Sequence, residues 1–210
     1  MPASLRNALG LLVLAVLALL ATTGTARAAT LTFDLWATPG TVTPPGGAAT
    51  PIWGFATAAG GAPSLPGPVL SVTQGDTVVI NLTNGLAEAA ALDFPGQALV
   101  PDQVGAAPGA STSYTFLADR PGTFLYQAGL LPQAEHQAAA GLYGALVVRP
   151  PPPGPGAPAQ AYADPASAYD AEAVLVLSEL DPALAAAPAS FDLRGYAPRY
   201  FLIKDRKSVV

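Results

Sequence analysis

The sequence contains no cysteine and a single histidine, His136, among its 210 residues. Without cysteine there is no disulfide, no thiolate nucleophile, no zinc finger, no iron–sulfur cluster and no cysteine ligand for a blue-copper site. One histidine also excludes a histidine-rich metal centre built within one chain. These absences leave few groups capable of catalysis, and the sequence assigns no catalytic residue.

Charged residues are scarce as well, at 11% of the chain, against about 25% in a typical soluble domain. The 14 acidic residues outnumber the 9 basic ones and give a formal net charge of −5. Nucleic acid is therefore not an expected partner, because phosphate binding requires clustered lysine and arginine. The chain does contain 51% hydrophobic residues, 21 glycines and 23 prolines. This mixture predicts a turn-rich β protein with enough apolar residues for a core.

Residues 1–28 have the pattern of a secretory signal peptide. Arg6 supplies a short positive region, Leu9–Leu20 is an apolar run without charge, and Ala26-Arg27-Ala28 is a small-residue cleavage motif. We expect cleavage before Ala29, export by the Sec route because no twin arginine is present, and a periplasmic or secreted location. The apolar run is short for a span of about 20 residues, so an uncleaved membrane anchor is the less favoured alternative. Cleavage removes two arginines and no acidic residue, so the mature chain is more acidic than the full chain, whose net charge is −5. No stable membrane span is expected in the mature chain.

Residues 29–149 are predicted to form one all-β domain. Short strand-like runs alternate with glycine and proline turns, and the clearest alternation places Val78, Ile80 and Leu82 on one face. Short strands at this spacing indicate a Greek-key β-sandwich or barrel. The predicted strands are Leu31–Ala37, Pro51–Phe55, Pro68–Gln74, Thr77–Thr83, Ala89–Phe94, Ser111–Leu117, Gly122–Gln127 and Leu142–Val148.

The composition changes after this domain. Residues 150–170 are rich in proline, alanine and glycine, which predicts a semi-rigid linker. Residues 171–204 contain a buried-strand pattern at Ala173–Leu177 and a turn at Asp181-Pro182, but they are too few to close a second sandwich. This segment is either the incomplete beginning of a second domain or an extension that packs on the first.

The final residues, 205–210, abruptly break the sparse-charge pattern with Asp-Arg-Lys-Ser-Val-Val. The start of a common sequencing-adapter strand, translated in frame, encodes the same six residues. We therefore expect adapter read-through at this end and a native chain that continues; an ordinary charged tail is the alternative.

Ordered motifs lie between Leu65 and Pro150. They are Leu65-Pro-Gly-Pro-Val-Leu70, Gln74-Gly-Asp-Thr-Val78, Asn81-Leu-Thr-Asn84, Pro121-Gly-Thr-Phe-Leu-Tyr126 and Gly141-Leu-Tyr-Gly-Ala-Leu-Val-Val148. In this order and spacing, the set resembles the N-terminal plastocyanin-like (cupredoxin) domain of the multicopper oxidases. The resemblance implies a copper-binding Greek-key sandwich, repeated two or three times, in a family that oxidises substrates and reduces dioxygen to water. Ala173–Pro182 is similar to the first strand of that family's second cupredoxin domain.

The same resemblance locates copper-ligand positions that this chain does not fill with histidine. A His-x-His-Gly motif of the family corresponds here to Asp93-Phe94-Pro95-Gly96, and a later His-x-His corresponds to Gln127-Ala128-Gly129. The ligand positions are thus occupied by Asp93, Pro95, Gln127 and Gly129. Proline and glycine offer no side-chain donor, and copper prefers imidazole to a lone carboxylate. We expect a cupredoxin domain without copper or any other cofactor in this chain, copper being implied only for the family or the full-length parent.

His136 allows two interpretations. It is a weak surface metal ligand together with Glu135 or Gln133, or a solvated loop histidine, since one imidazole and one carboxylate cannot enclose a metal. Asp93 and Asp102 could be an acid–base pair, but nothing in the sequence fixes their separation, and turn capping is the preferred role.

The replaced ligand loops are expected to be stabilised by packing. Phe94 should turn inward beside Pro95, and Gly129 should allow a close approach of the neighbouring chain. Leu125 and Tyr126 should complete an apolar plug where the family has a metal-filled cavity.

Three functions remain open. The first is an exported multicopper-oxidase-like protein, represented by an N-terminal fragment that is inactive by itself although its family consists of copper-dependent oxidoreductases. The second is a metal-free cupredoxin that acts as a binding or interaction module of the bacterial envelope. The third is a small periplasmic enzyme with unrecognised chemistry, which the poor supply of catalytic groups disfavours. The expected partners are further cupredoxin domains of the same polypeptide or a second copy in a homo-oligomer.

Overall fold

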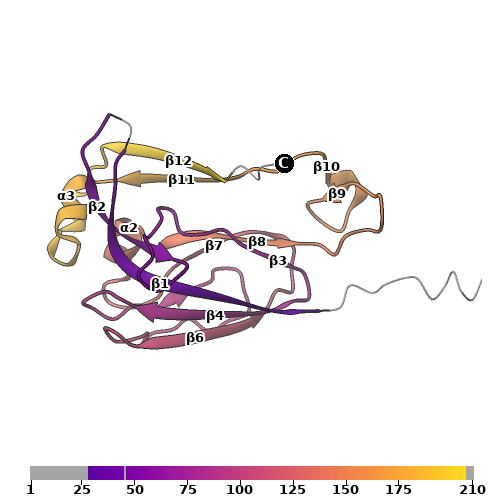
Figure 1. Ribbon diagram of the computed structural model, residues 1–210, viewed down its shortest axis with the longest axis horizontal. Helices are drawn as coiled ribbons and strands as arrows, with labels where there is room; N and C mark the ends of the chain where they lie inside the picture. The colour runs from indigo at the N-terminus through magenta and orange to yellow at the C-terminus, as the bar shows by residue number, and fades with distance from the viewer. Residues whose placement is uncertain (1–27, 45, 207–210) are drawn as a thin grey trace, which may run out of the picture.

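The computed structural model describes residues 28–206 except residue 45. Two four-stranded sheets pack face to face, with strand orders β2-β1-β4-β6 and β3-β8-β7-β5 (Figure 1). The all-β sandwich predicted from the sequence is thus confirmed. The first sheet contains β1 (Thr30–Val42), β2 (Thr50–Ala56), β4 (Thr77–Asn84) and β6 (Ser111–Leu117), and the second contains β3 (Leu70–Thr73), β5 (Leu92–Asp93), β7 (Gly122–Ala128) and β8 (Tyr143–Arg149).

Strand β4 forms the centre of the first sheet. Val78, Ile80 and Leu82 are each 0% exposed, as their alternation predicts. β4 pairs in parallel with β1 and antiparallel with β6. β1 runs beyond its predicted end at Ala37, because it continues to pair with β2 after its pairing with β4 stops there. Pro39 lies in this extension, where β1 is an edge of the sheet, and sheet edges tolerate proline.

Strand β5 is much shorter than the predicted Ala89–Phe94. Only Leu92 and Asp93 pair with β7. Ala90 instead forms an isolated bridge with Ala106, through backbone hydrogen bonds of 3.0 and 2.8 Å. The chain therefore enters the second sheet only for these two residues.

Aromatic side chains fill the core between the sheets. The ring of Phe94 lies 5.7 Å from Tyr114, 5.1 Å from Phe116 and 6.4 Å from Tyr126, measured between centroids. The buried Tyr126 hydroxyl donates a hydrogen bond of 2.7 Å to the carbonyl oxygen of Pro68, as a buried tyrosine requires. Because β5 ends at Asp93, Phe94 is the first residue of the following loop and anchors that loop in the core.

The proline-rich segment after β8 is not wholly extended. It forms a small two-stranded sheet and then returns to the sandwich, where the Arg149 side chain bonds to Glu172 and Ser71. The Tyr169 hydroxyl donates a 2.8 Å hydrogen bond to Glu172. The elements of this segment are β9 (Ala159–Gln160), η1 (Pro165–Ser167) and β10 (Ala168–Tyr169).

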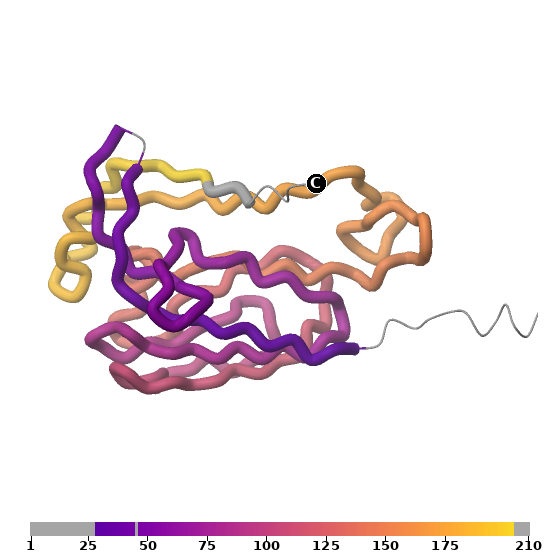
Figure 2. The backbone as a smooth tube through the Cα atoms, viewed as in Figure 1, coloured from indigo at the N-terminus to yellow at the C-terminus, as the bar shows by residue number. Residues whose placement is uncertain are grey.

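A β-hairpin follows and runs alongside the second sheet (Figure 2). Leu180 and Ala185 pack with Ile52 and Leu65 in a second apolar cluster, which holds one end of the hairpin on the sandwich. The segment therefore does pack on the first domain; whether it also begins a second domain remains a prediction, as do the domain limits at 149 and 170. Its elements are β11 (Val174–Leu180), α3 (Pro182–Ala186), η2 (Pro188–Ser190), η3 (Leu193–Gly195) and β12 (Tyr200–Arg206).

Two sequence predictions fall largely outside the described residues. The signal peptide at 1–28 lies there except for Ala28, and of the hexapeptide 205–210 only Asp205 and Arg206 are described, as the end of β12 paired with β11. In the described part of the chain, no helix has the length and apolar character that crossing a membrane requires.

Candidate functional site

The fold brings the two predicted ligand loops together. Asp93 on β5 is the direct pairing partner of Gln127 on β7. Just beyond them, the Gly129 backbone nitrogen donates a 2.8 Å hydrogen bond to the carbonyl oxygen of Ala91. Pro95 follows on the first loop and is exposed. Positions that lie about 35 residues apart in the sequence therefore lie at one end of the second sheet, as a shared ligand site would require.

The side chains at this end do not fit a copper ion. Of the four positions, only Asp93 and Gln127 carry an oxygen donor, and both side chains are half-buried. Among the described residues the Asp93 carboxylate forms no hydrogen bond or ion pair, and no group of three or more histidine, aspartate or glutamate side chains is close enough to hold a metal. Copper sites in proteins are built mainly on imidazole and sulfur donors, and these positions offer neither.

The backbone at Gly129 leaves no room for a side chain. A Cβ atom there would lie 2.7 Å from the Ala91 Cβ atom and 3.1 Å from its carbonyl carbon. The close approach of the two loops predicted from this glycine is thus confirmed. Any larger residue at position 129 requires the chain at Ala91, just before β5, to shift.

The apolar plug is confirmed in two of its three members. Phe94 and Tyr126 are buried at 2% and 0% exposure. Leu125 was expected in the plug and is not part of it, since it is 48% exposed on the outer face of β7. Neighbouring residues on a strand point to opposite faces, so Leu125 and Tyr126 cannot both face the core.

Asp102 caps a turn, as predicted, and also anchors a buried tyrosine. Its Oδ1 atom accepts backbone hydrogen bonds from Val104 at 2.8 Å and Gly105 at 2.9 Å. Its Oδ2 atom accepts one of 2.8 Å from the Tyr114 hydroxyl, which in turn accepts one of 2.9 Å from the Leu92 nitrogen. No hydrogen bond or ion pair joins Asp102 to Asp93 among the described residues, so the structure gives no support to an acid–base pair.

The electrostatics of this pair follow from burial and hydrogen bonding. Burial raises the pKa of Tyr114 strongly; the Leu92 hydrogen bond lowers it, and the Asp102 charge raises it further. Burial also acts to raise the pKa of Asp102, but the hydrogen bonds from Gly105, Val104 and Tyr114 outweigh it, so the net pKa is lowered. Asp102 is therefore held as a carboxylate and Tyr114 as a neutral phenol.

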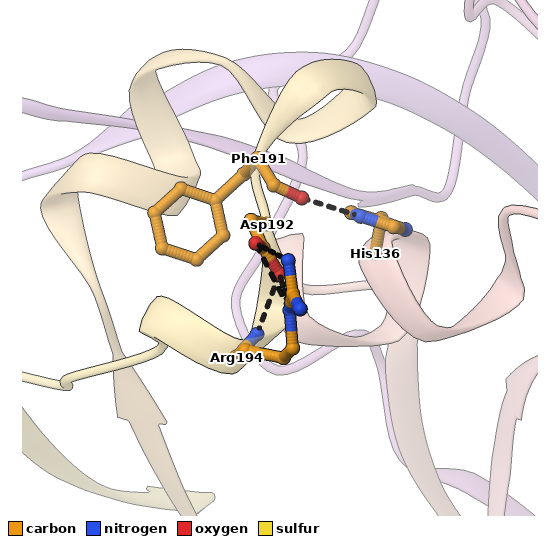
Figure 3. Close-up of polar contacts among 4 residues, drawn as sticks. All are labelled: His136, Phe191, Asp192 and Arg194. Atoms are coloured by element: carbon orange, nitrogen blue, oxygen red, sulfur yellow. Dashed lines mark hydrogen bonds and ion pairs between the residues drawn. The ribbon is translucent and has the colours of Figure 1, made fainter.

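His136 does not lie in a solvated loop. It is half-buried on helix α2 (Ala134–Ala140), and its Nε2 atom lies 2.8 Å from the carbonyl oxygen of Phe191 (Figure 3). Because a carbonyl oxygen only accepts, Nε2 carries the proton and is not available as a metal ligand in this arrangement. Just after Phe191, the Asp192 carboxylate forms an ion pair with the exposed Arg194 side chain (Figure 3). His136 therefore connects α2 to the C-terminal segment.

A pocket of 260 Å³ beside Gln127 was not anticipated from the sequence. It lies between β7, the end of α2 and β11, and its polar lining is formed by Gln127, Tyr143, Ser178, Glu179 and Tyr196. Burial, together with the negative charge of Glu179, raises the pKa of Tyr196 to about 12. Burial raises the pKa of Tyr143 as well; Ser178 lowers it and Glu179 raises it. No local pattern marked this pocket, because its members come from distant segments.

The fold and the paired loops define this protein as a cupredoxin-like β-sandwich. Residues 37–153, more than half of the chain, match the family described as multicopper oxidase. The chain belongs to this family.

Two curated relatives illustrate the match. An L-ascorbate oxidase from Cucurbita pepo var. melopepo is 37% identical over 126 residues, which cover 55% of this chain and 20% of that protein. An L-ascorbate oxidase from Cucumis sativus is 37% identical over 98 residues, covering 41% of this chain and 16% of that protein. The chain thus matches about a fifth of the length of these relatives.

Solved structures show the same fold. A multicopper oxidase from Pseudomonas thermotolerans superposes with a TM-score of 0.53 and 27% identity, over 61% of this chain and 32% of that chain. A blue copper oxidase from Nitrosomonas europaea superposes with a TM-score of 0.64 and 22% identity, over 83% of this chain and 53% of that chain. The second likeness supports the fold alone.

Proposed function

We propose that this chain is the exported N-terminal part of a multicopper-oxidase-like protein whose first cupredoxin domain binds no copper. In this proposal the domain contributes a scaffold and an interaction surface. The copper-dependent oxidation typical of the family is left to sites outside residues 29–149. The chain by itself is then inactive as an oxidase.

The observation that carries the proposal is the pairing of Asp93 with Gln127. The two loops lie side by side, while the residues at their four ligand positions supply one carboxylate, one amide and no imidazole. Packing of Phe94 and Tyr126, rather than coordination, fills the space beneath. Paired loops that lack imidazole donors support a structural role for this domain.

The hairpin β11–β12 supports the presence of a neighbouring domain. Its outer face carries four exposed large apolar side chains, at 53–77% exposure: Leu175, Leu177, Phe201 and Ile203. Such a face is unfavourable in water and is normally covered by further protein. We propose that further strands of the same polypeptide cover it as a second cupredoxin-like domain, consistent with relatives about five times as long as the matched stretch.

A metal-free binding module is the second candidate. The 260 Å³ pocket beside Gln127 favours it, because hydroxyl, amide and carboxylate groups converge there on apolar walls. The two candidates differ in where copper is held. In the first the complete polypeptide binds copper elsewhere, whereas in the second it binds none.

Copper analysis tests the proposal. The chain from Ala29 to Val210 should retain no stoichiometric copper after dialysis against a chelator, should lack intense blue absorption, and should not take up oxygen with phenols or diamines. A histidine-complete member of the family, treated identically, provides the positive control. A tightly held copper ion in this chain would refute the copper-free domain.

Export is tested separately. When the full-length gene is expressed in a bacterial host, the protein should appear in the periplasm or medium, and its mass should be that of a chain starting at Ala29. Replacing Leu14 and Leu17 in the apolar run with arginine should keep the protein in the cytoplasm at full length. A full-length protein found in the membrane fraction would favour the uncleaved anchor instead.

A further inference from the structure

Ala29, the residue just before β1, is tied to a buried carboxylate. The backbone nitrogen of Ala29 donates a 2.9 Å hydrogen bond to Oδ1 of Asp76. Immediately beside it, the nitrogen of Thr77 donates a 2.8 Å hydrogen bond to the carbonyl oxygen of Ala29. β1 then begins at Thr30, paired in parallel with Thr77 on β4 (Figure 1). Ala29 is thus fixed through both of its backbone groups.

Asp76 has no cationic partner in the described part of the chain. The residue is only 6% exposed and lies in the turn between β3 and β4. Its two oxygens accept hydrogen bonds from the backbone nitrogens of Ala29 and, at 2.8 Å, Thr73. None of the ion pairs formed by described residues includes Asp76. Buried carboxylates are usually compensated by a positive charge as well as by hydrogen bonds.

We propose that proteolytic processing before Ala29 supplies this missing charge, so that the new α-ammonium group of Ala29 forms an ion pair with the Asp76 carboxylate. The inference rests on the export and cleavage proposed above. Hydrolysis breaks the peptide bond between Ala28 and Ala29 and consumes one water molecule. The Ala28 carbonyl carbon takes the hydroxyl group and becomes a carboxylate, and the Ala29 nitrogen takes protons and becomes an ammonium group.

The atom that changes is the one already in contact with Asp76. The neutral amide donor at 2.9 Å becomes a charged donor at the same position. The acceptor is already a carboxylate, so processing adds the Coulombic attraction of a full positive charge to an existing charge-assisted hydrogen bond. Asp76 is part of the turn that leads into β4, so the ion pair joins the first residue of the processed chain to the central strand. Processing thereby adds an ion pair next to the first residue pair of β1 and β4, Thr30 and Thr77.

The test compares α-amino groups that differ only in charge. One protein starts at Ala29 with a free amine, and a second is the same chain acetylated at that amine. The acetylated chain keeps the amide donor of the unprocessed protein. We expect the free-amine protein to unfold about 2–4 °C higher, the shift that a gain of about 1 kcal/mol gives a chain of this size. Asp76→Asn should abolish the difference, whereas Asp34→Asn, at an exposed carboxylate on β1, should preserve it.

A second measurement remains valid if Asp76→Asn folds poorly. A carboxylate partner holds the amine in its protonated, unreactive form, so acylation of the Ala29 amine near pH 7 should be about tenfold slower in the folded parent chain than in the urea-unfolded one. The Asp34→Asn chain should show the same ratio as the parent. Equal rates in folded and unfolded protein, or equal melting temperatures with and without the acetyl group, would overturn the ion pair.

Failure of the processing step looks different. The mass of the exported protein reports the cleavage position, whereas the acetylation comparison uses chains whose start is set in vitro. Cleavage elsewhere overturns the proposal through the mass alone; cleavage before Ala29 with equal melting temperatures overturns it through the missing ion pair.

Discussion

Tyr114 on β6 donates a 2.8 Å hydrogen bond to Asp102, a residue of the loop that follows β5. The same hydroxyl accepts a hydrogen bond from the backbone of Leu92 on β5. One buried phenol therefore joins both sheets to this loop. In this chain that arrangement and aromatic packing hold the segment around Asp93.

Tyr114→Phe should destabilise the domain by about 1–3 kcal/mol, because it leaves the Leu92 nitrogen and an Asp102 oxygen without their partner. Urea unfolding should show a lower midpoint with an unchanged slope. Tyr162→Phe is the matched control, since Tyr162 is 54% exposed, and it should have little effect. Equal midpoints for both variants would mean that the Tyr114 hydroxyl contributes nothing.

The contribution of Asp102 should depend on pH. Hydrogen bonds lower its pKa in the folded protein, so its stabilising effect is fully present above the unfolded pKa of about 4 and is lost as pH falls through the folded value. The difference in urea midpoint between the parent and Asp102→Asn should therefore be largest near neutral pH and shrink in acid. A difference that widens below about pH 4 would contradict the assignment.

Restoring histidine at Asp93, Pro95, Gln127 and Gly129 should destabilise the fold and should not create an oxidase. The largest loss should come from Gly129, where even a Cβ atom would lie 2.7 Å from the Ala91 side chain. The triple variant that keeps Gly129 should therefore unfold at a clearly higher temperature than the quadruple one. The measurement is thermal unfolding of each variant with and without Cu(II). A midpoint of the metal-free quadruple variant equal to or above that of the parent chain would show that the two loops are not closely packed.

Leu180→Ala should release the hairpin β11–β12 from the sandwich. Leu180 is 1% exposed in the second apolar cluster, and removing a buried leucine costs about 2–5 kcal/mol. Hydrogen exchange should rise in β11 and β12 and change little in β4. The control Leu177→Ala removes a side chain that is 74% exposed on the same strand, and faster exchange in both variants alike would argue against docking through Leu180.

Much of the sandwich could be predicted from local patterns. The alternation around Ile80 specified β4, and the run Ser111–Leu117 matched β6 at both ends. Alternation succeeds because one face of each strand is buried, so a shift by one residue would expose the whole apolar set. The same rule, applied strictly, would have placed Leu125 outside. Leu125 is as hydrophobic as its buried neighbours, so hydrophobicity alone does not distinguish it from Tyr126, whereas strand geometry does.

For the candidate site, the sequence by itself establishes only which residue types are present. The identities of Asp93, Pro95, Gln127 and Gly129 by themselves exclude imidazole from these positions. The pairing of Asp93 with Gln127, the bond from His136 to Phe191 and the pocket beside Gln127 could not be predicted. Each joins segments at least 33 positions apart in the printed sequence.

By itself, the sequence determined the strand faces, the turns and the supply of possible ligands, because these depend on neighbouring residues and on composition. Only the tertiary structure decided that Ala29 meets Asp76, that Gly129 lies against Ala91, and that Leu180 is buried while Leu177 is exposed. Such contacts depend on which strands lie next to each other in a sheet and in which register. Strand order is set by the packing of the whole chain, since closing long loops costs entropy that only the complete core can offset.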